Sequence, residues 1–96
     1  DNILFWHRNI ERKGFYLNGW INHYPDFIVV TNRGNIVLLE TKGDDRDNSD
    51  SAQKLKLGKA WQSAAGRNYK YFMVFDQQQL EGALKLDEFM GVIRDL

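Results

Sequence analysis

Two carboxylates and a lysine stand close together along the chain, at spacings that suit metal-assisted chemistry. Asp26 begins an apolar run, and thirteen residues separate it from Glu40, which precedes Lys42 by two positions. Alternate residues of a strand share a face, so Glu40 and Lys42 are expected on the same side of a sheet. Two carboxylates at short range repel each other, and a divalent cation that prefers oxygen ligands, such as Mg²⁺, relieves the repulsion. This set favours phosphodiester hydrolysis, in which the cation polarises the phosphate and Lys42 orients water or offsets charge.

Whether Asp26 joins the other two side chains depends on the turn between their strands. A two-residue turn would place Asp26 opposite Thr41 and send its side chain to the other face. A three-residue loop that ends at Gly34, with that glycine in the left-handed conformation, places Asp26 opposite Glu40 instead. We expect the three-residue loop, in which both carboxylates and Lys42 converge on one face.

The elements that must position these residues alternate between strands and helices. Residues 24–31 and 35–42 are rich in Ile, Val and Leu on both faces, which predicts central strands that are covered on both sides. The strand, helix and strand expected between 35 and 75 form a crossover unit suited to parallel pairing. The other expected elements are strands over 3–8, 14–20 and 69–75, a polar loop over 43–50, and helices over 51–65 and 86–96. The predicted fold class is therefore α/β, with a central mixed sheet flanked by helices.

The helix expected after the polar loop carries signals at both ends. Asp50 is the candidate N-cap, and Gly66 is the residue at which the helix is expected to stop. Apolar residues at the helical spacing i, i+3, i+4 and i+7 are expected on its buried face, namely Leu57, Ala60, Trp61 and Ala64.

Length and composition indicate one packed domain over residues 1–96. A hydrophobic content of 43%, with three Trp, four Tyr and six Phe, is typical of a globular core and excludes a disordered chain. The sequence has no cysteine, so any metal must be held by oxygen or imidazole ligands. Thirteen basic residues balance thirteen acidic ones, which disfavours autonomous DNA binding but allows a catalytic module whose substrate is delivered by an attached domain.

Targeting signals are lacking in the sequence. No apolar run approaches the roughly 20 residues that span a bilayer, and no basic segment leads into an apolar one at the start. We expect a soluble, cytoplasmic protein with no membrane partner. The chain opens with Asp1 and enters an apolar stretch at once, which predicts that it is a piece of a longer protein.

The stretch YPDFIVV together with LLETKG resembles the signature of the PD-(D/E)XK nuclease superfamily. Within that superfamily the sequence resembles the C-terminal nuclease domain of the restriction subunit of type III restriction enzymes and related helicase-nuclease fusions. The resemblance extends from WHRN, through FYL and a helix with Lys54 and Trp61, to YKYFMVF, and so covers most of the chain. A PD followed by ExK is weak alone, but its placement on adjacent strands before a helix and another strand makes it stronger.

The resemblance implies a restriction-endonuclease-like fold and Mg²⁺-dependent cleavage of double-stranded DNA. Asp26 and Glu40 would be metal ligands, with the Thr41 backbone carbonyl as a candidate third ligand, and Lys42 would be the catalytic lysine. It also implies an N-terminal ATP-dependent helicase or translocase domain in the parent chain, and a modification (methyltransferase) subunit as partner. Many members carry a further acidic residue in a helix before the first core strand, and Glu11 is the only candidate for it here.

The sequence allows two interpretations for several residues. Lys54 and Lys59 either contact the DNA backbone or solubilise an exposed helix face, and the resemblance favours contact for Lys54. Glu40 and Lys42 could instead form an ordinary solvated ion pair. His23 is not expected to be a ligand, although it lies near Asp26 in the sequence. The alternative functions are a non-catalytic DNA-binding or docking module of the same fold and a repair or transposon-type nuclease.

Overall fold

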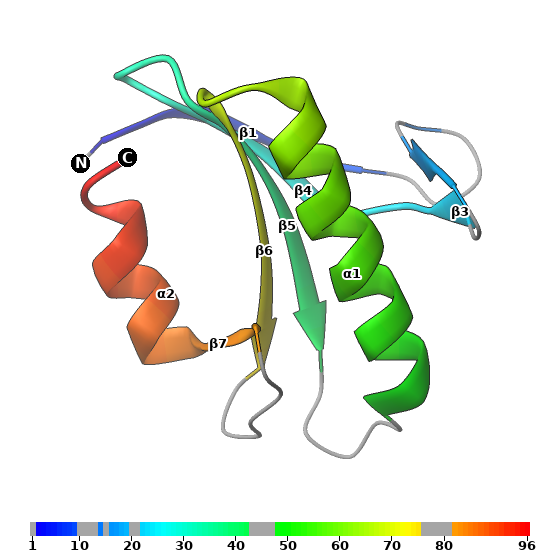
Figure 1. Ribbon diagram of the computed structural model, residues 1–96. Coiled ribbons are helices and arrows are strands. Elements are labelled where there is room, and N and C mark those ends of the chain that lie inside the picture. Colours follow the sequence, from blue (N-terminus) through cyan, green and yellow to red (C-terminus); the bar gives the residue numbers. More distant parts are fainter. Residues whose placement is uncertain (1, 10–13, 15, 20–21, 43–47, 76–81) are drawn as a thin grey trace.

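A five-stranded mixed sheet with a helix on each face makes up the core of the computed structural model (Figure 1). The structure describes residues 2–9, 14, 16–19, 22–42, 48–75 and 82–96. The elements are β1 (Ile3–Arg8), β2 (Leu17–Asn18), β3 (Asn22–His23), β4 (Phe27–Thr31), β5 (Ile36–Lys42), α1 (Asn48–Ala65), β6 (Tyr69–Phe75), β7 (Leu84–Lys85) and α2 (Leu86–Ile93). The strand order is β1-β4-β5-β6-β7, and β2 and β3 form a separate two-stranded sheet. The predicted α/β class with a central mixed sheet is confirmed.

The hairpin between β4 and β5 has the predicted three-residue loop. Thr31 N–H donates to the Asn35 carbonyl at 2.9 Å, and Gly34 N–H donates to the Thr31 carbonyl at 3.0 Å. Gly34 has a φ of +89°, a conformation that glycine adopts without a Cβ clash. Strand partners run from Val30 with Ile36 through to Phe27 with Leu39, so the next step places Asp26 opposite Glu40.

Leu96, three residues after the end of α2, accepts hydrogen bonds from both residues of the first pair of this hairpin. Thr31 Oγ1 donates to the Leu96 carbonyl at 2.6 Å, and Asn35 Nδ2 donates to the same oxygen at 2.8 Å. The Thr31 hydroxyl also accepts the Asn35 N–H at 3.1 Å. The register that matters for the site is therefore supported from the opposite end of the hairpin.

The crossover from β5 through α1 to β6 pairs the two strands in parallel, as predicted. Gly66 follows the last helical residue with a φ of +122°, which confirms it as the helix stop. The predicted start is wrong, because α1 begins at Asn48 and so includes Asp50 and the end of the expected loop. Asp50 therefore lies inside the helix and is not its N-cap.

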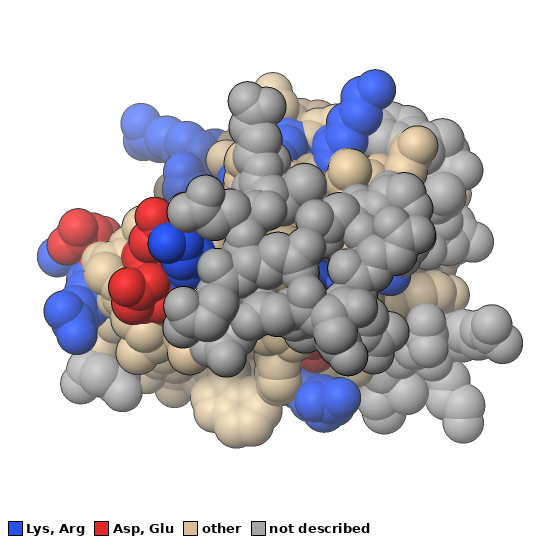
Figure 2. Space-filling model, turned by 90° about the horizontal axis from the view of Figure 1, so that it is seen from below, with Lys and Arg blue, Asp and Glu red and all other residues tan. Residues whose placement is uncertain are grey.

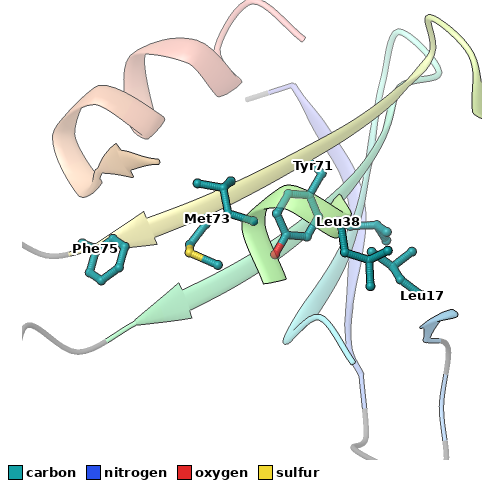
Figure 3. Close-up of a cluster of buried hydrophobic side chains, with 7 residues drawn as sticks. Leu17, Leu38, Tyr71, Met73 and Phe75 are labelled. Atoms are coloured by element: carbon teal, nitrogen blue, oxygen red, sulfur yellow. The ribbon is translucent and has the colours of Figure 1, made fainter. Parts of the chain in front are cut away.

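Apolar residues cover both faces of the sheet, as the central strands predicted. The cluster on the α1 face contains Leu17, Leu38, Leu55, Leu57, Tyr71, Met73 and Phe75 (Figure 3). The cluster on the α2 face contains Val29, Val37, Val74, Phe89 and Ile93. Alternate residues of β5 and β6 therefore point to opposite faces of the sheet. The same alternation determines which face Glu40, Thr41 and Lys42 point to at the end of β5.

The buried face of α1 agrees with the expected one at Leu57, which is buried, and at Trp61, which packs against the apolar cluster, but not at the two alanines. Ala60 and Ala64 are exposed, whereas the buried residues of this helix are Ser51, Leu55, Leu57 and Gly58. A Cβ atom at Gly58 would lie 2.4 Å from the Tyr71 ring, so the helix meets the sheet most closely where it has no side chain. The close approach of Gly58 to the Tyr71 ring therefore determines which face of α1 is buried, and the predicted positions of Ala60 and Ala64 do not.

The N-terminal part departs from the prediction more than the C-terminal part does. β1 pairs antiparallel with β4 at the sheet edge, but within the expected strand over 14–20 only Leu17–Asn18 is a strand among the described residues. Trp6 on β1 is 63% exposed. α2 begins at Leu86 as predicted, and β7, which precedes it directly, was not expected. No helix in the described part of the chain is both long and apolar enough to cross a membrane.

Candidate active site

Glu40 and Lys42 belong to the α1 face of the sheet. Leu38 lies in the apolar cluster on that face, so alternation along β5 places Glu40 and Lys42 there as well. Asp26 lies at the bend before β4, where strand alternation no longer fixes the direction of its side chain. Its carboxylate contacts the side chain of Thr41, which alternates to the other face, while its charge still acts on Glu40. The convergence of all three side chains on one face therefore stays a prediction.

The carboxylate of Asp26 is held by the residue that follows Glu40. Asp26 Oδ2 accepts hydrogen bonds from the backbone N–H and from Oγ1 of Thr41, each at 2.9 Å. The contacts seen use the N–H and hydroxyl of Thr41, and the predicted role of its carbonyl as a metal ligand stays a prediction. These bonds tie the start of β4 to the end of β5 and fix Asp26 beside Glu40.

Glu40 is the most unusual group of the site, because its carboxylate is buried beside two lysines. It is 5% exposed, and its Oε2 lies 3.4 Å from Lys42 Nζ and 3.9 Å from Lys54 Nζ. Its Oε1 is buried and has no hydrogen-bond partner among the described residues. Burial, followed by the negative charge of Asp26, raises the pKa of Glu40 to about 7, although the two lysines act in the opposite direction.

The donor set fits a hard divalent cation. Glu40 Oε1 is an acceptor without a donor, and the neighbouring charge of Asp26 adds to the energetic need for a cation. Mg²⁺ keeps several waters and takes one or two protein carboxylates, which matches the two found here. Within the described residues there is no group of three or more His, Cys, Asp or Glu that could hold a metal.

The two lysines predicted to contact DNA occupy different surroundings. Lys54 reaches into the site from α1 and lies beside Glu40. Lys59 Nζ donates to the Tyr71 carbonyl at 2.9 Å and lies 5.2 Å from the centroid of the Phe72 ring. Burial lowers the pKa of Lys59. Of the pair, only Lys54 therefore adjoins the candidate catalytic residues, and Glu11 lies outside the described residues.

A buried polar pair next to the site was not identified from the sequence. His23 Nε2 lies 2.6 Å from the Tyr71 hydroxyl, and both residues are 0% exposed. Burial raises the pKa of Tyr71, and the charges of Glu40 and Asp26 raise it further. Figure 3 shows the Tyr71 hydroxyl within the apolar cluster on the α1 face. The signal available in the sequence was a tyrosine on the buried face of β6, because a buried phenol requires a polar partner.

The surface at the ends of β5 and β6 carries charges of both signs. Figure 2, seen from this end of the molecule, shows Lys and Arg side chains on several sides and Asp and Glu side chains mainly at the left. The described part of this surface is therefore not a uniformly basic platform, in agreement with the net charge of zero.

No protein-family model, curated protein or solved structure matches the chain. The resemblance to PD-(D/E)XK nucleases therefore stays a prediction, and the case for function rests on the residues and the geometry of the site.

Proposed function

We propose that the chain is a Mg²⁺-dependent endonuclease domain that hydrolyses DNA phosphodiester bonds. The observation that carries this proposal is the buried carboxylate of Glu40, which lies 3.4 Å from Lys42 Nζ and is affected by the charge of Asp26. The buried and unbonded Oε1 of Glu40 supports a cation at this position, since such an atom is costly without a partner.

Each side chain of the site has a role in such a reaction. Asp26 and Glu40 would hold the cation, with the Thr41 carbonyl as third ligand. Mg²⁺, when bound, supplies Lewis-acid polarisation of the phosphate and lowers the pKa of a bound water. Lys42 lies 3.4 Å from Glu40 Oε2, which holds its ammonium group where it can orient the attacking water or offset charge on the phosphate.

The finer proposal is that the chain is the cleavage module of a type III restriction enzyme. An ATP-dependent helicase or translocase domain of the parent chain would deliver double-stranded DNA, and a modification (methyltransferase) subunit would be the partner protein. The zero net charge supports delivery by another domain, because phosphate binding by a domain alone depends on a basic excess. A repair or transposon-type nuclease would use the same residues.

One observation favours a non-catalytic DNA-binding or docking module as the second candidate. The hydrogen bonds from Thr41 give Asp26 a structural task that requires no metal. A module that had lost its activity would keep these bonds for stability alone.

Metal binding separates the two candidates. Titration with Mn²⁺, followed by the electron paramagnetic resonance signal of the free ion, should show one site in the wild type and none in Asp26→Asn or Glu40→Gln. Asp95→Asn, which removes a carboxylate at the far end of the hairpin, should bind as the wild type does. Slow nicking of supercoiled plasmid should follow the same pattern and should also be lost in Lys42→Met. A wild type that binds no Mn²⁺, or an Asp26→Asn variant that binds it normally, would favour the non-catalytic module.

A further inference from the structure

The candidate site holds two carboxylates and two lysines, and one of those lysines comes from the helix. Glu40 faces Lys42 on the same strand and Lys54 on α1, and the charge of Asp26 acts on the same carboxylate. We propose that Lys54 is a displaceable counter-cation: it neutralises Glu40 when no metal is bound and leaves for a substrate phosphate when a dication enters. This inference rests on the proposed metal site and extends it, because it assigns Lys54 a role in metal affinity as well as in DNA contact.

The two lysines approach the same oxygen from different elements. Lys42 Nζ lies 3.4 Å from Glu40 Oε2 with 12% of its side chain exposed, and Lys54 Nζ lies 3.9 Å away with 23% exposed. Lys42 is paired with Phe75 of β6 at the end of a central strand, and its side chain is the less exposed of the two, so its ammonium group has less freedom than that of Lys54. Lys54 is the more distant and more exposed of the two, and its long side chain can swing toward solvent. It is therefore the group that can leave.

Both lysines use Oε2, which leaves the second oxygen of Glu40 unbonded. Oε1 is buried with no hydrogen-bond partner in the described part of the chain. A cation bound at Oε1 would lie on the same carboxylate as Lys54 and would repel its ammonium group, because like charges within several ångströms interact strongly in a partly buried site. Metal binding and the Lys54 contact therefore compete for Glu40, although they use different oxygens.

The competition between the metal and Lys54 changes the net charge of the site, and this change affects substrate binding. Without metal, the four charged groups of the site cancel, so the site has no net attraction for a polyanion. With a dication bound, the same groups carry two positive charges in excess, and the displaced Lys54 adds a donor near the surface. A phosphodiester would then be attracted only to the metal-loaded site.

Two affinities that should change in opposite directions when Lys54 is replaced, the one for Mn²⁺ and the one for DNA, test the proposal. At about pH 8, where carboxylates are ionised, Lys54→Met should bind Mn²⁺ roughly tenfold more tightly than the wild type, because one repelling charge is gone. The same variant should bind a fluorescent duplex several-fold more weakly in Ca²⁺, since a phosphate donor is gone. Lys54→Gln lacks the charge but can still donate a hydrogen bond to Glu40, so it provides a second variant if Lys54→Met does not fold.

Two controls separate the charge of Lys54 from its position. Lys54→Arg keeps the charge and should retain the wild-type Mn²⁺ affinity. Lys56→Met removes an exposed lysine from the same helix and should leave Mn²⁺ affinity unchanged. A wild type that binds Mn²⁺, with Lys54→Met or Lys54→Gln binding it equally or more weakly, would overturn the counter-cation role and leave the proposed nuclease intact. A wild type that binds no Mn²⁺ would overturn both.

Discussion

Asp26 Oδ2 accepts two hydrogen bonds from Thr41, one from the backbone N–H and one from the hydroxyl. The same carboxylate raises the pKa of Glu40 through its charge. Asp26 therefore stabilises the junction of β4 and β5 through its oxygen atom and destabilises it through its charge. Substitutions that separate the oxygen from the charge can measure each effect.

Asp26→Asn keeps an acceptor oxygen for Thr41 and removes the charge that repels Glu40. We expect the metal-free variant to be as stable as the wild type or more stable by about 0.5 to 1 kcal/mol, because strain is commonly held at functional sites. Asp26→Ala loses the oxygen as well and should be less stable than Asp26→Asn by about 1 to 2 kcal/mol. Urea unfolding in EDTA gives both differences. An Asp26→Asn variant that unfolds as readily as Asp26→Ala would show that Asp26 is an ordinary structural ion.

The contact between α1 and β6 gives a second prediction with an internal control. A Cβ atom at Gly58 would lie 2.4 Å from the Tyr71 ring, whereas one at Gly91 in α2 would meet nothing within 4 Å. Gly58→Ala should therefore lower the free energy of unfolding by about 1 to 3 kcal/mol through overpacking. Gly91→Ala should raise it by about 0.5 to 1 kcal/mol, since alanine favours a helix. Chemical unfolding of both variants checks the pair, and equal effects of the two substitutions would contradict the close approach of α1.

Local chemistry in the sequence was sufficient to predict the hairpin and its register. Gly34 marks a three-residue loop, and this loop sets the register, because strands that are apolar on both faces could be buried in either register. The placement of Glu40 and Lys42 on one face followed from alternation alone. These features depend on residues near one another in the sequence.

The features that were missed depend on contacts between distant residues. The rotation of α1 follows from Gly58 meeting Tyr71, which an apolar spacing cannot reveal because glycine adds no hydrophobic side chain. The approach of Lys54 to Glu40 depends on that rotation. Likewise, the hydrogen bond that Thr41 N–H donates to Asp26 requires the bend before β4. β7 was missed for another reason, because its two residues are too few to show a pattern.

Weak DNA binding is expected of the isolated chain. Its thirteen basic and thirteen acidic residues give no net charge, so few counterions would be released from DNA on binding. The affinity for a fluorescent duplex should be weaker than micromolar, and cleavage should be slow or absent without an attached translocating domain. Fluorescence anisotropy at two salt concentrations measures both the affinity and its electrostatic part. Submicromolar, sequence-specific binding by these residues alone would contradict delivery by another domain.

The stability of the metal-free protein should fall as the pH rises toward neutrality, because Glu40 holds its proton more tightly when folded. Burial, and then the charge of Asp26, raise the pKa of Glu40 from 4.5 to about 7. The folded state therefore binds more protons than the unfolded state between these values. The destabilisation is absent below about pH 4.5, grows through the window and is complete above about pH 7. Its full size is on the order of 3 kcal/mol.

Glu40→Gln removes this titration and serves as the reference. The free energy of unfolding of Glu40→Gln minus that of the wild type should increase by up to about 3 kcal/mol between pH 5 and pH 8 in EDTA. Glu88→Gln, an exposed substitution in α2, should show no such increase. Saturating Mg²⁺ should reduce the difference at pH 8, because a cation bound at Glu40 stabilises the ionised carboxylate in the folded state. If the free energies of unfolding of the wild type and Glu40→Gln changed with pH in the same way, burial would not destabilise the ionised carboxylate of Glu40. The energetic argument for a cation at Oε1 would then fail.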